Sequence, residues 1–391
     1  MSRVVSLFIL LTLTLLQAQS YEALLKKALE KSSALAIAKT QEAQEQLQGK
    51  IATRLENPTL EVEIADFSAK RLLRENEVGT RVGLTQPLLL PWVKDDQERL
   101  SHHSIQLAKA RYRATKATFV YHFNRLYLAY KEARKKEQLA QEALRISQKI
   151  LSVAKERFSA GSIAKSELLQ AKIETKEVES KIKEIQLERV KAKHELLRFA
   201  NLSLEDELST AHQFRLKAST LITQPLLAVA QKEQERADAK LALASHTIER
   251  IELFSEIESE PDQDIFRLGV AIPLPLFHNN SEEKQLAKIE IANQTVRLEA
   301  EKRALELELK QLQHEIATQK SLQLNYQALI AKQEQLLAMY QEGYAIAKVN
   351  LLKLNTLKKS LLQTKEQLLG STLAIEQKII KINYLQGAYH E

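Results

Sequence analysis

Residues 93–224 form a very long stretch that contains no proline and a single glycine, Gly161. Proline breaks the interior of a helix and glycine weakens it, so this run predicts helix almost throughout. On each side of Gly161 the apolar residues repeat at spacings of three and four, the period of helices packed in a coiled coil. We therefore expect two long helices that form a hairpin at Gly161, with a kink in one continuous helix as the alternative. At about 1.5 Å per residue, the arm 93–157 spans about 95 Å, more than a compact domain needs.

The composition supports a helical protein with few turns. The chain has 391 residues, 44% of them hydrophobic, with only 8 Gly and 7 Pro, a profile unlike that of an ordinary enzyme. It has no cysteine, which excludes disulfides, thiolate metal sites, cysteine nucleophiles and an acylated N-terminal cysteine. The net charge of +7 comes from 57 basic and 50 acidic residues. These charges are interleaved along the helices, which favours solvated helix faces over a nucleic-acid partner.

Residues 1–20 have the pattern of a signal peptide. Arg3 provides the positive charge, and an apolar run follows at 4–16, too short to span a bilayer comfortably. Ala18 and Ser20 are the small residues expected before cleavage after Ser20. A retained membrane anchor is the alternative. We expect an exported protein.

The mature chain is expected to contain two structural repeats, the first at 21–225. It begins with a helix at 21–55, and apolar and charged residues then alternate at 60–64 and at 78–85. Such alternation predicts two β-strands, here a strand pair within 58–88 that flanks a charged loop at 68–77. The long helical hairpin follows at 92–200, and an irregular segment at 201–225 ends the repeat.

The second repeat, 226–391, has the same order: a helix, a strand pair at 250–273 and a helical hairpin at 278–387. The stretch from Arg81 to Pro87 aligns without a gap with the stretch from Arg267 to Pro273, which indicates an internal duplication. Gly343 lies 182 residues after Gly161 (343 minus 161), close to the offset of 186 residues between the aligned strands (267 minus 81). It is expected to play the same part at a second tip. The returning arm carries two apolar seams, as expected for a helix with neighbours on both sides in the wall of a cylinder.

The four predicted strands have an apolar side and a charged side. The apolar side carries Leu60, Val62, Ile64, Val78, Val82, Leu84, Leu253, Ile257, Leu268 and Val270. The charged side carries Glu61, Glu63, Arg81, Glu252, Glu256 and Arg267. This pattern is typical of a lipid-embedded barrel around water, and a soluble sandwich is the alternative. Since the smallest closed membrane barrels have eight strands, we expect several chains to share one barrel.

Taken together, these motifs resemble the TolC family of outer-membrane efflux proteins along nearly the whole mature chain. The resemblance rests on the two strand–proline segments, GTRVGLTQPLLL (79–90) and FRLGVAIPLPLF (266–277), and on two hairpin tips. The tips are RFSAGSIAKSELLQA (157–171) and YQEG (340–343) leading to Leu351 and Leu352. The proline-bounded strands resemble those of the heavy-metal efflux branch. Some relatives carry a lipidated N-terminal cysteine, which this chain lacks.

The resemblance implies a mainly α fold with a small β part. Long helical hairpins would form a periplasmic α-barrel, and four strands per chain would contribute to a twelve-stranded outer-membrane β-barrel in a homotrimer. The implied partners are outer-membrane lipid, a periplasmic adaptor (membrane fusion) protein and an inner-membrane pump of the RND or ABC type.

The function that we expect is a passive exit duct of a tripartite efflux or type I secretion system. It would catalyse no reaction and need no cofactor, because the pump supplies the energy. The alternative is a structural periplasmic coiled-coil or adaptor protein without a membrane barrel. The cargo, whether metal ions, drugs or a polypeptide, stays open.

The resemblance also implies two groups of functional residues. The expected adaptor contacts at the hairpin tips are Gly161, Ser162, Ile163, Ala164, Gly343, Tyr344 and Ala345. The candidate periplasmic constriction consists of Glu167 and Tyr340, which match an acidic and an aromatic position of the family, and of Lys353, which stands where relatives have an acidic residue and which we add as our own hypothesis. We expect three copies of Glu167 to narrow the entrance, with Lys353 or Lys165 as ion-pair partner. Alternatively, Glu167 is a solvated carboxylate stabilised by the helix dipole.

Other chemistry is not indicated. His102 and His103 are adjacent, so they point about 100° apart on a helix and share one metal ion poorly. No phosphate-binding loop, nucleophile elbow or dinucleotide fingerprint occurs. The pairs Glu61/Glu63 and Glu252/Glu256 fit a hydrated lumen wall, with Arg81 and Arg267 as partners, better than catalytic carboxylates.

Overall fold

The computed structural model describes residues 20–66, 78–203, 208–217, 224–277 and 279–389. The expected signal peptide, apart from Ser20, and the charged loop 68–77 lie outside the described residues. Two helices, α1 (Tyr21–Glu30) and α2 (Ser33–Thr53), precede the strands β1 (Thr59–Asp66) and β2 (Val78–Leu89). The first hairpin then consists of α3 (Pro91–Ser159) and α4 (Lys165–Phe199).

The second half repeats this order. Helix α5 (Pro225–Ala244) leads to the strands β3 (Arg250–Ser259) and β4 (Asp264–Ala271). The second hairpin consists of α6 (Ser281–Ala345) and α7 (Leu351–Leu385). Helices α4 and α7 have the same length of 35 residues. The alignment that matches Arg81 with Arg267 also matches their first and last residues.

The first helix differs from the sequence prediction. We expected one helix at 21–55, and the structure has a break at Lys31 and Ser32. Ser32 is the N-cap of α2, where its side-chain oxygen accepts a hydrogen bond from the backbone N–H of Leu35 at 3.4 Å. Serine competes with the backbone for such hydrogen bonds, so it favours a new helix start over a helix interior.

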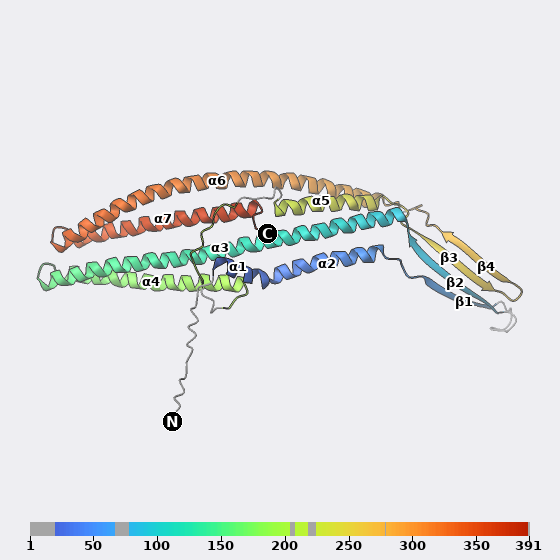
Figure 1. Cartoon of the computed structure of the whole chain (residues 1–391), viewed down its shortest axis with the longest axis horizontal. Coiled ribbons are helices and arrows are strands. Elements are labelled where there is room, and N and C mark those ends of the chain that lie inside the picture. Colours follow the sequence, from blue (N-terminus) through green and yellow to red (C-terminus); the bar gives the residue numbers. More distant parts are fainter. Residues whose placement is uncertain (1–19, 67–77, 204–207, 218–223, 278, 390–391) are drawn as a thin grey trace, which may run out of the picture.

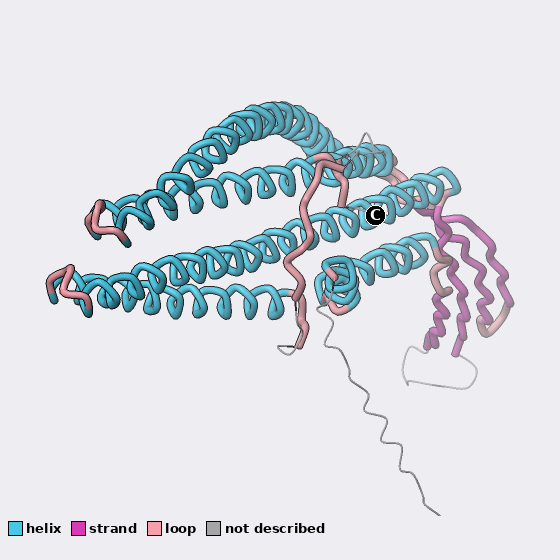
Figure 2. Tube along the Cα trace, turned by 60° about the vertical axis from the view of Figure 1, so that its left-hand side comes forward, coloured by secondary structure: helices cyan, strands magenta, loops and turns pink. Residues whose placement is uncertain are grey.

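The helices form an elongated curved wall with the sheet at one end (Figure 1). Helices α3 and α6 run through most of its length. On one side of α3, α2 packs against the half near the sheet and α4 against the half near the tips. Between α3 and α6, α5 and α7 follow each other in the same way. The wall therefore has two free edges, one made by α2 and α4 and the other by α6 (Figure 2).

The four strands form one antiparallel sheet in the order β1-β2-β3-β4. The registers place Val62 opposite Val82 and Val82 opposite Ile257, so apolar residues meet across the strands. Glu63 likewise lies opposite Arg81, and Glu256 opposite Arg267. The two repeats are joined through the β2–β3 pair, which leaves β1 and β4 as open edges.

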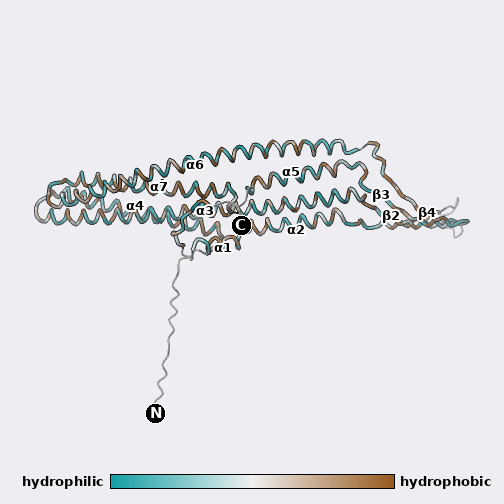
Figure 3. Tube along the Cα trace, turned by 45° about the horizontal axis from the view of Figure 1, so that its top comes forward, coloured by the Kyte–Doolittle hydropathy of each residue, from teal (hydrophilic) through white to brown (hydrophobic). Residues whose placement is uncertain are grey.

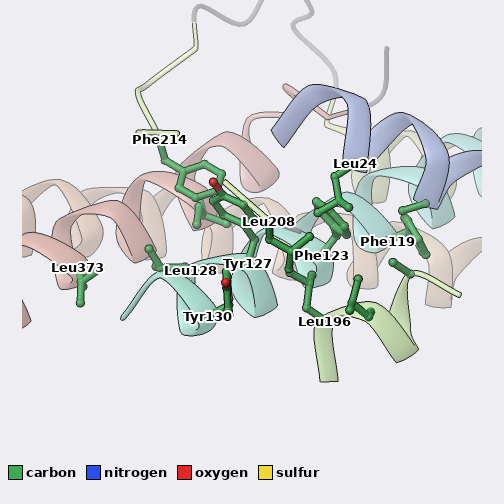
Figure 4. Packing of buried hydrophobic residues seen from close by; sticks show 14 residues of the cluster. Leu24, Phe119, Phe123, Tyr127, Leu128, Tyr130, Leu196, Leu208, Phe214 and Leu373 are labelled. Carbon is green, nitrogen blue, oxygen red and sulfur yellow. The ribbon is translucent and has the colours of Figure 1, made fainter. Parts of the chain in front are cut away.

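The main hydrophobic core is a cluster of buried residues around the middle of α3 (Figure 4). There, aromatic residues of α3 pack against α1, the end of α4, α7 and the segment 208–217. Beside this core, the Lys131 ammonium of α3 donates to both carboxylate oxygens of Glu376 of α7, at 2.7 and 2.8 Å. Lys131 also donates to the carbonyl of His212 at 2.7 Å. Both side chains are buried, so this ion pair joins the two hairpins and the irregular segment.

The expected fold class is confirmed, since the described chain is mainly helical with long hairpins and four strands. Hydrophobic and hydrophilic residues alternate along its helices (Figure 3), as helices with a packed side and a solvated side require. Among the described residues, no helix combines the length and the apolar character needed to span a bilayer.

Candidate channel wall and hairpin tips

One face of the sheet is apolar and exposed. Val62 of β1, Val82 of β2, Ile257 of β3 and Leu268 of β4 are 63%, 41%, 59% and 75% exposed. Phe266, which the sequence reading missed, lies on the same face and is 67% exposed. Soluble monomers rarely expose a contiguous apolar surface of this kind, and such surfaces mark contacts with lipid or protein.

The opposite face is charged, and ion pairs cross all four strands. Arg81 contacts the carboxylate of Glu63, and its second nitrogen lies 3.7 Å from Glu256. Arg267 contacts Glu256 and also Glu258. The structure thus brings together four of the six residues predicted for this face. The strand alternation could also have shown Glu258, which is the next residue of β3 on the same face after Glu256.

The remaining two predicted residues, Glu61 and Glu252, belong to the same face. Glu61 lies opposite Gly83, and Glu252 lies opposite Pro87 and Ala271. Because Gly83 also lies opposite Glu256, Glu61 belongs to the row of Glu256 and Arg267, separated from them by Gly83, whereas Glu252 lies outside the ion-paired rows.

At the first hairpin tip, Gly161 has a positive φ of 70°. The N–H of Ser162 donates to the carbonyl of Arg157 at 2.8 Å, which closes the last turn of α3. This is the Schellman arrangement, in which the residue after the cap is left-handed and usually glycine. Gly161 therefore ends α3 in a tight turn, and the alternative of a kinked continuous helix is wrong.

The second tip corrects the prediction for Gly343. This glycine lies inside α6, and the left-handed residue is Ala347, with φ 64°. The N–H of Lys348 donates to the carbonyl of Gly343 at 2.7 Å, as Ser162 does to Arg157. The alignment of the strands also pairs position 347, and not 343, with position 161, so Ala347 is the true counterpart of Gly161. Gly343 has a different role, because a Cβ there would lie 2.6 Å from a methyl group of Val349.

Tyr344 joins the two tips. Its side chain is 1% exposed, and the Arg157 guanidinium lies over its ring, 4.6 Å from the ring centre. Burial, together with the neighbouring Glu167 carboxylate, raises the pKa of Tyr344 to about 12. The Tyr344 hydroxyl and one Glu167 oxygen are buried, and neither forms a hydrogen bond of regular geometry with the described residues. The tips therefore meet in a compact Arg157–Tyr344–Glu167 contact, which we call the tip cluster.

The tip cluster changes the roles predicted for several residues. Tyr344 is too buried to contact an adaptor, whereas Ser162, Ala164 and Ala345 are exposed. Ile163 and Tyr340 are half-buried and pack on the apolar cluster between the hairpins. The sequence reading missed the exposed apolar residues near the tips, Phe158, Ile346 and Leu352.

Within one chain, Glu167 has a different neighbour from the expected lysines, and the expected pairs between copies stay a prediction. Within the described residues, no ion pair joins Glu167 to Lys353 or Lys165, and both lysines are exposed. Glu167 instead lies beside Tyr344, whose pKa its carboxylate helps to raise. The buried lysine near the start of α7 is Lys358, which donates to Glu174 and Ser147 at 3.2 Å each.

The histidine pair does not form a metal centre. The rings of His102 and His103 are 5.8 Å apart and nearly perpendicular, and His103 Nδ1 lies 3.3 Å from a carboxylate oxygen of Glu235. Among the described residues, no group of three or more candidate ligands comes together.

Comparison with known proteins agrees with this geometry. Residues 24–201 match the model of the outer membrane efflux protein family. The sequence matches none of the curated proteins with which it was compared. The structure is similar to that of CusC, with a TM-score of 0.76 and 18% identity over 93% of this chain and 91% of that one.

Two further solved structures are similar to the same extent. The CmeC outer membrane channel of Campylobacter jejuni has a TM-score of 0.77 and 17% identity, over 95% of this chain and 86% of that one. The outer membrane protein VceC of Vibrio cholerae has a TM-score of 0.77 and 15% identity, over 93% of this chain and 95% of that one.

An amphipathic sheet in line with a long helical wall is the fold that this chain shares with these structures. The family match covers residues 24–201, and the fold of the whole described chain is that of these solved outer-membrane proteins. The matched family model and the CmeC and VceC structures are all of outer membrane proteins.

Proposed function

We propose that three copies of this chain form a passive exit duct through the outer membrane and the periplasm. The observation that carries this proposal is the open sheet with one apolar and one charged face. Four strands cannot close a membrane barrel, whereas three chains supply twelve. The apolar face would then meet lipid, and the ion-paired face would line a hydrated lumen.

The edges of the helical wall support the same assembly. Leu187 and Val190 on α4 are exposed apolar residues of one edge, and Leu324 and Leu329 on α6 belong to the other. Exposed apolar residues on both edges are stabilised when they are buried. In a ring of copies, the α4 edge of one copy would pack against the α6 edge of the next and bury both. A head-to-tail contact of this kind closes into a ring when the rotation permits.

Cross-linking between copies tests this assembly, and the cysteine-free sequence makes it simple. Leu187 on α4 and Leu324 on α6 stand at a similar height above the tips, because nearly equal lengths of helix separate each from its own tip. The double variant Leu187→Cys/Leu324→Cys should form trimers linked by disulfides. Leu286 lies near the sheet, so the Leu187→Cys/Leu286→Cys control should stay uncrosslinked. Equal cross-linking of both pairs would contradict the proposed interface.

The duct is proposed to dock through its tips to a periplasmic adaptor and an inner-membrane pump of the RND or ABC type. Bulky substitutions at the exposed Ser162, Ala164 or Ala345 should abolish efflux and leave the yield of trimer unchanged. Efflux of a fluorescent cargo and trimer yield, measured on the same cells, check this. Equal loss of both would mean that these residues serve folding.

The tip cluster is proposed to hold the periplasmic end narrow. Tyr344 links the second tip to Glu167 and Arg157 of the first, so its removal frees the hairpins from each other. Glu167→Ala should raise single-channel conductance in planar bilayers and lower the preference for cations. Unchanged current and selectivity would leave Glu167 as a structural residue of the tip.

A further inference from the structure

We propose that segment 272–277 lies at the periplasmic boundary of the outer membrane and binds the lipid there. This inference rests on the proposed membrane position of the sheet and goes beyond it, because the segment belongs to no strand or helix. It joins β4 to α6, at the end of the sheet where the helices begin (Figure 1).

The segment is the most exposed apolar stretch beside the sheet. Ile272, Leu274 and Leu276 are 55%, 72% and 75% exposed, and Phe277 is fully exposed. Along β4 the even-numbered residues 266, 268 and 270 form the apolar face, and Ile272 and Leu274 continue this series past the last strand residue. The proposed lipid surface of the sheet thus extends into the connection.

Two prolines argue against another strand as the cover of this segment. The β3–β4 ladder ends with Glu252 opposite Ala271, and the next positions include Pro273 and Pro275. Proline has no N–H and cannot donate to a ladder, so a neighbouring copy gains few backbone hydrogen bonds here. Lipid needs no such donors, and it suits the four large apolar side chains.

The polarity of the chain changes directly after the segment. Asn279, Asn280 and Ser281 follow, and the first turn of α6 carries two glutamates. An apolar stretch that gives way to polar residues within a few positions is typical of a bilayer interface, where aromatic side chains such as that of Phe277 are enriched.

The first repeat supports the same boundary. Pro87 and Leu88 correspond to Pro273 and Leu274 in the alignment of the two repeats, and Trp92 follows at the start of α3. Trp92 is the single tryptophan of the chain and is 54% exposed. Tryptophan is enriched at membrane–water interfaces. Both strand-to-helix connections therefore carry residues suited to the level of the lipid head groups.

Depth-dependent fluorescence quenching tests the proposal. In a Trp92→Phe background, Phe277→Trp places the single tryptophan in the segment, where full exposure makes the change easy to accommodate. Leu268→Trp provides the reporter for the apolar face of the sheet, and Leu307→Trp provides one on α6 away from the sheet. Each trimer is reconstituted in phosphatidylcholine vesicles whose acyl chains carry bromine at a shallow or a deep position.

Phe277→Trp should lose fluorescence strongly, and more with the shallow than with the deep label, whereas Leu307→Trp should lose none. If Phe277→Trp behaves like Leu307→Trp while Leu268→Trp is quenched, the segment is covered by protein or faces water, and the inference is wrong. If Leu268→Trp is not quenched either, the proposed membrane sheet fails as well.

Discussion

At the scale of single residues, the two hairpin tips use different residues for the same backbone shape. Gly161 and Ala347 both adopt the left-handed conformation, which costs a residue with a Cβ roughly 1–2 kcal/mol. The second tip therefore carries a strain that the first avoids.

This difference predicts opposite effects of two matched substitutions. Gly161→Ala should lower stability by about 1 kcal/mol, and Ala347→Gly should raise it by a similar amount. Denaturant midpoints of the purified protein check the signs. Gly370→Ala, in the middle of α7 with open space around it, is the control for helix propensity alone. If both tip variants shift the midpoint in one direction, the assigned backbone conformations are wrong.

The buried tyrosines predict a loss of stability at high pH. Burial raises the pKa of Tyr127, Tyr344 and Tyr389 from 10.0 to about 12. The folded state therefore holds these protons when the unfolded chain has begun to release them. The stabilisation is fully present below pH 10 and is lost as the pH rises towards 12. Tyr344→Phe should reduce this alkaline loss, as measured by denaturant midpoints at several pH values. An unchanged dependence of stability on pH would mean that the pKa of the Tyr344 hydroxyl is not raised in the folded protein.

The tips also show where sequence reasoning reached its limit. Residue type suggested Gly343 as the counterpart of Gly161, although the two glycines do not align when the strands do. The alignment of the strands, carried through to the tips, leads to Ala347. The role of Tyr344 was not accessible, because its contacts with Arg157 and Glu167 depend on how two separate hairpins pack.

At the scale of helices and strands, alternation and heptad spacing were sufficient to predict the elements. The two faces of the sheet follow directly from the period of two, and the long hairpins follow from the absence of proline. The contact between the hairpins did not follow, because Lys131 and Glu376 lie 245 residues apart in the sequence.

This buried ion pair predicts a large single-site effect. Glu376→Ala should lower the free energy of unfolding by about 3–5 kcal/mol, because it leaves the Lys131 ammonium buried without its partner. The double variant Lys131→Met/Glu376→Leu removes both charges and should cost much less. Denaturant unfolding of the four proteins in the cycle measures the coupling. Additive effects would show that the pair does not join α3 to α7 energetically.

The two faces of the sheet predict unequal tolerance of charge. Val62→Arg or Val82→Arg should cost roughly 2–4 kcal/mol if these positions lie near the bilayer midplane. Glu63→Gln on the other face should cost at most about 1 kcal/mol, the value of an exposed ion pair. Folding equilibria in lipid vesicles would provide both numbers. Similar costs on both faces would contradict a barrel with lipid outside and water inside.

At the scale of the whole molecule, both the sheet and the helical wall are left open. The sheet ends in two unpaired strands, and the helical wall ends in two apolar edges. A single chain leaves all four of these surfaces uncovered. The open sheet and the open helical wall thus support the same proposal, that further copies of the chain complete the structure.

Native mass spectrometry of the protein extracted from membranes in mild detergent tests this requirement most directly. The account predicts a complex of three chains as the main species, which should persist when detergent is exchanged. A main species of one or two chains would contradict the proposed trimer with its twelve strands.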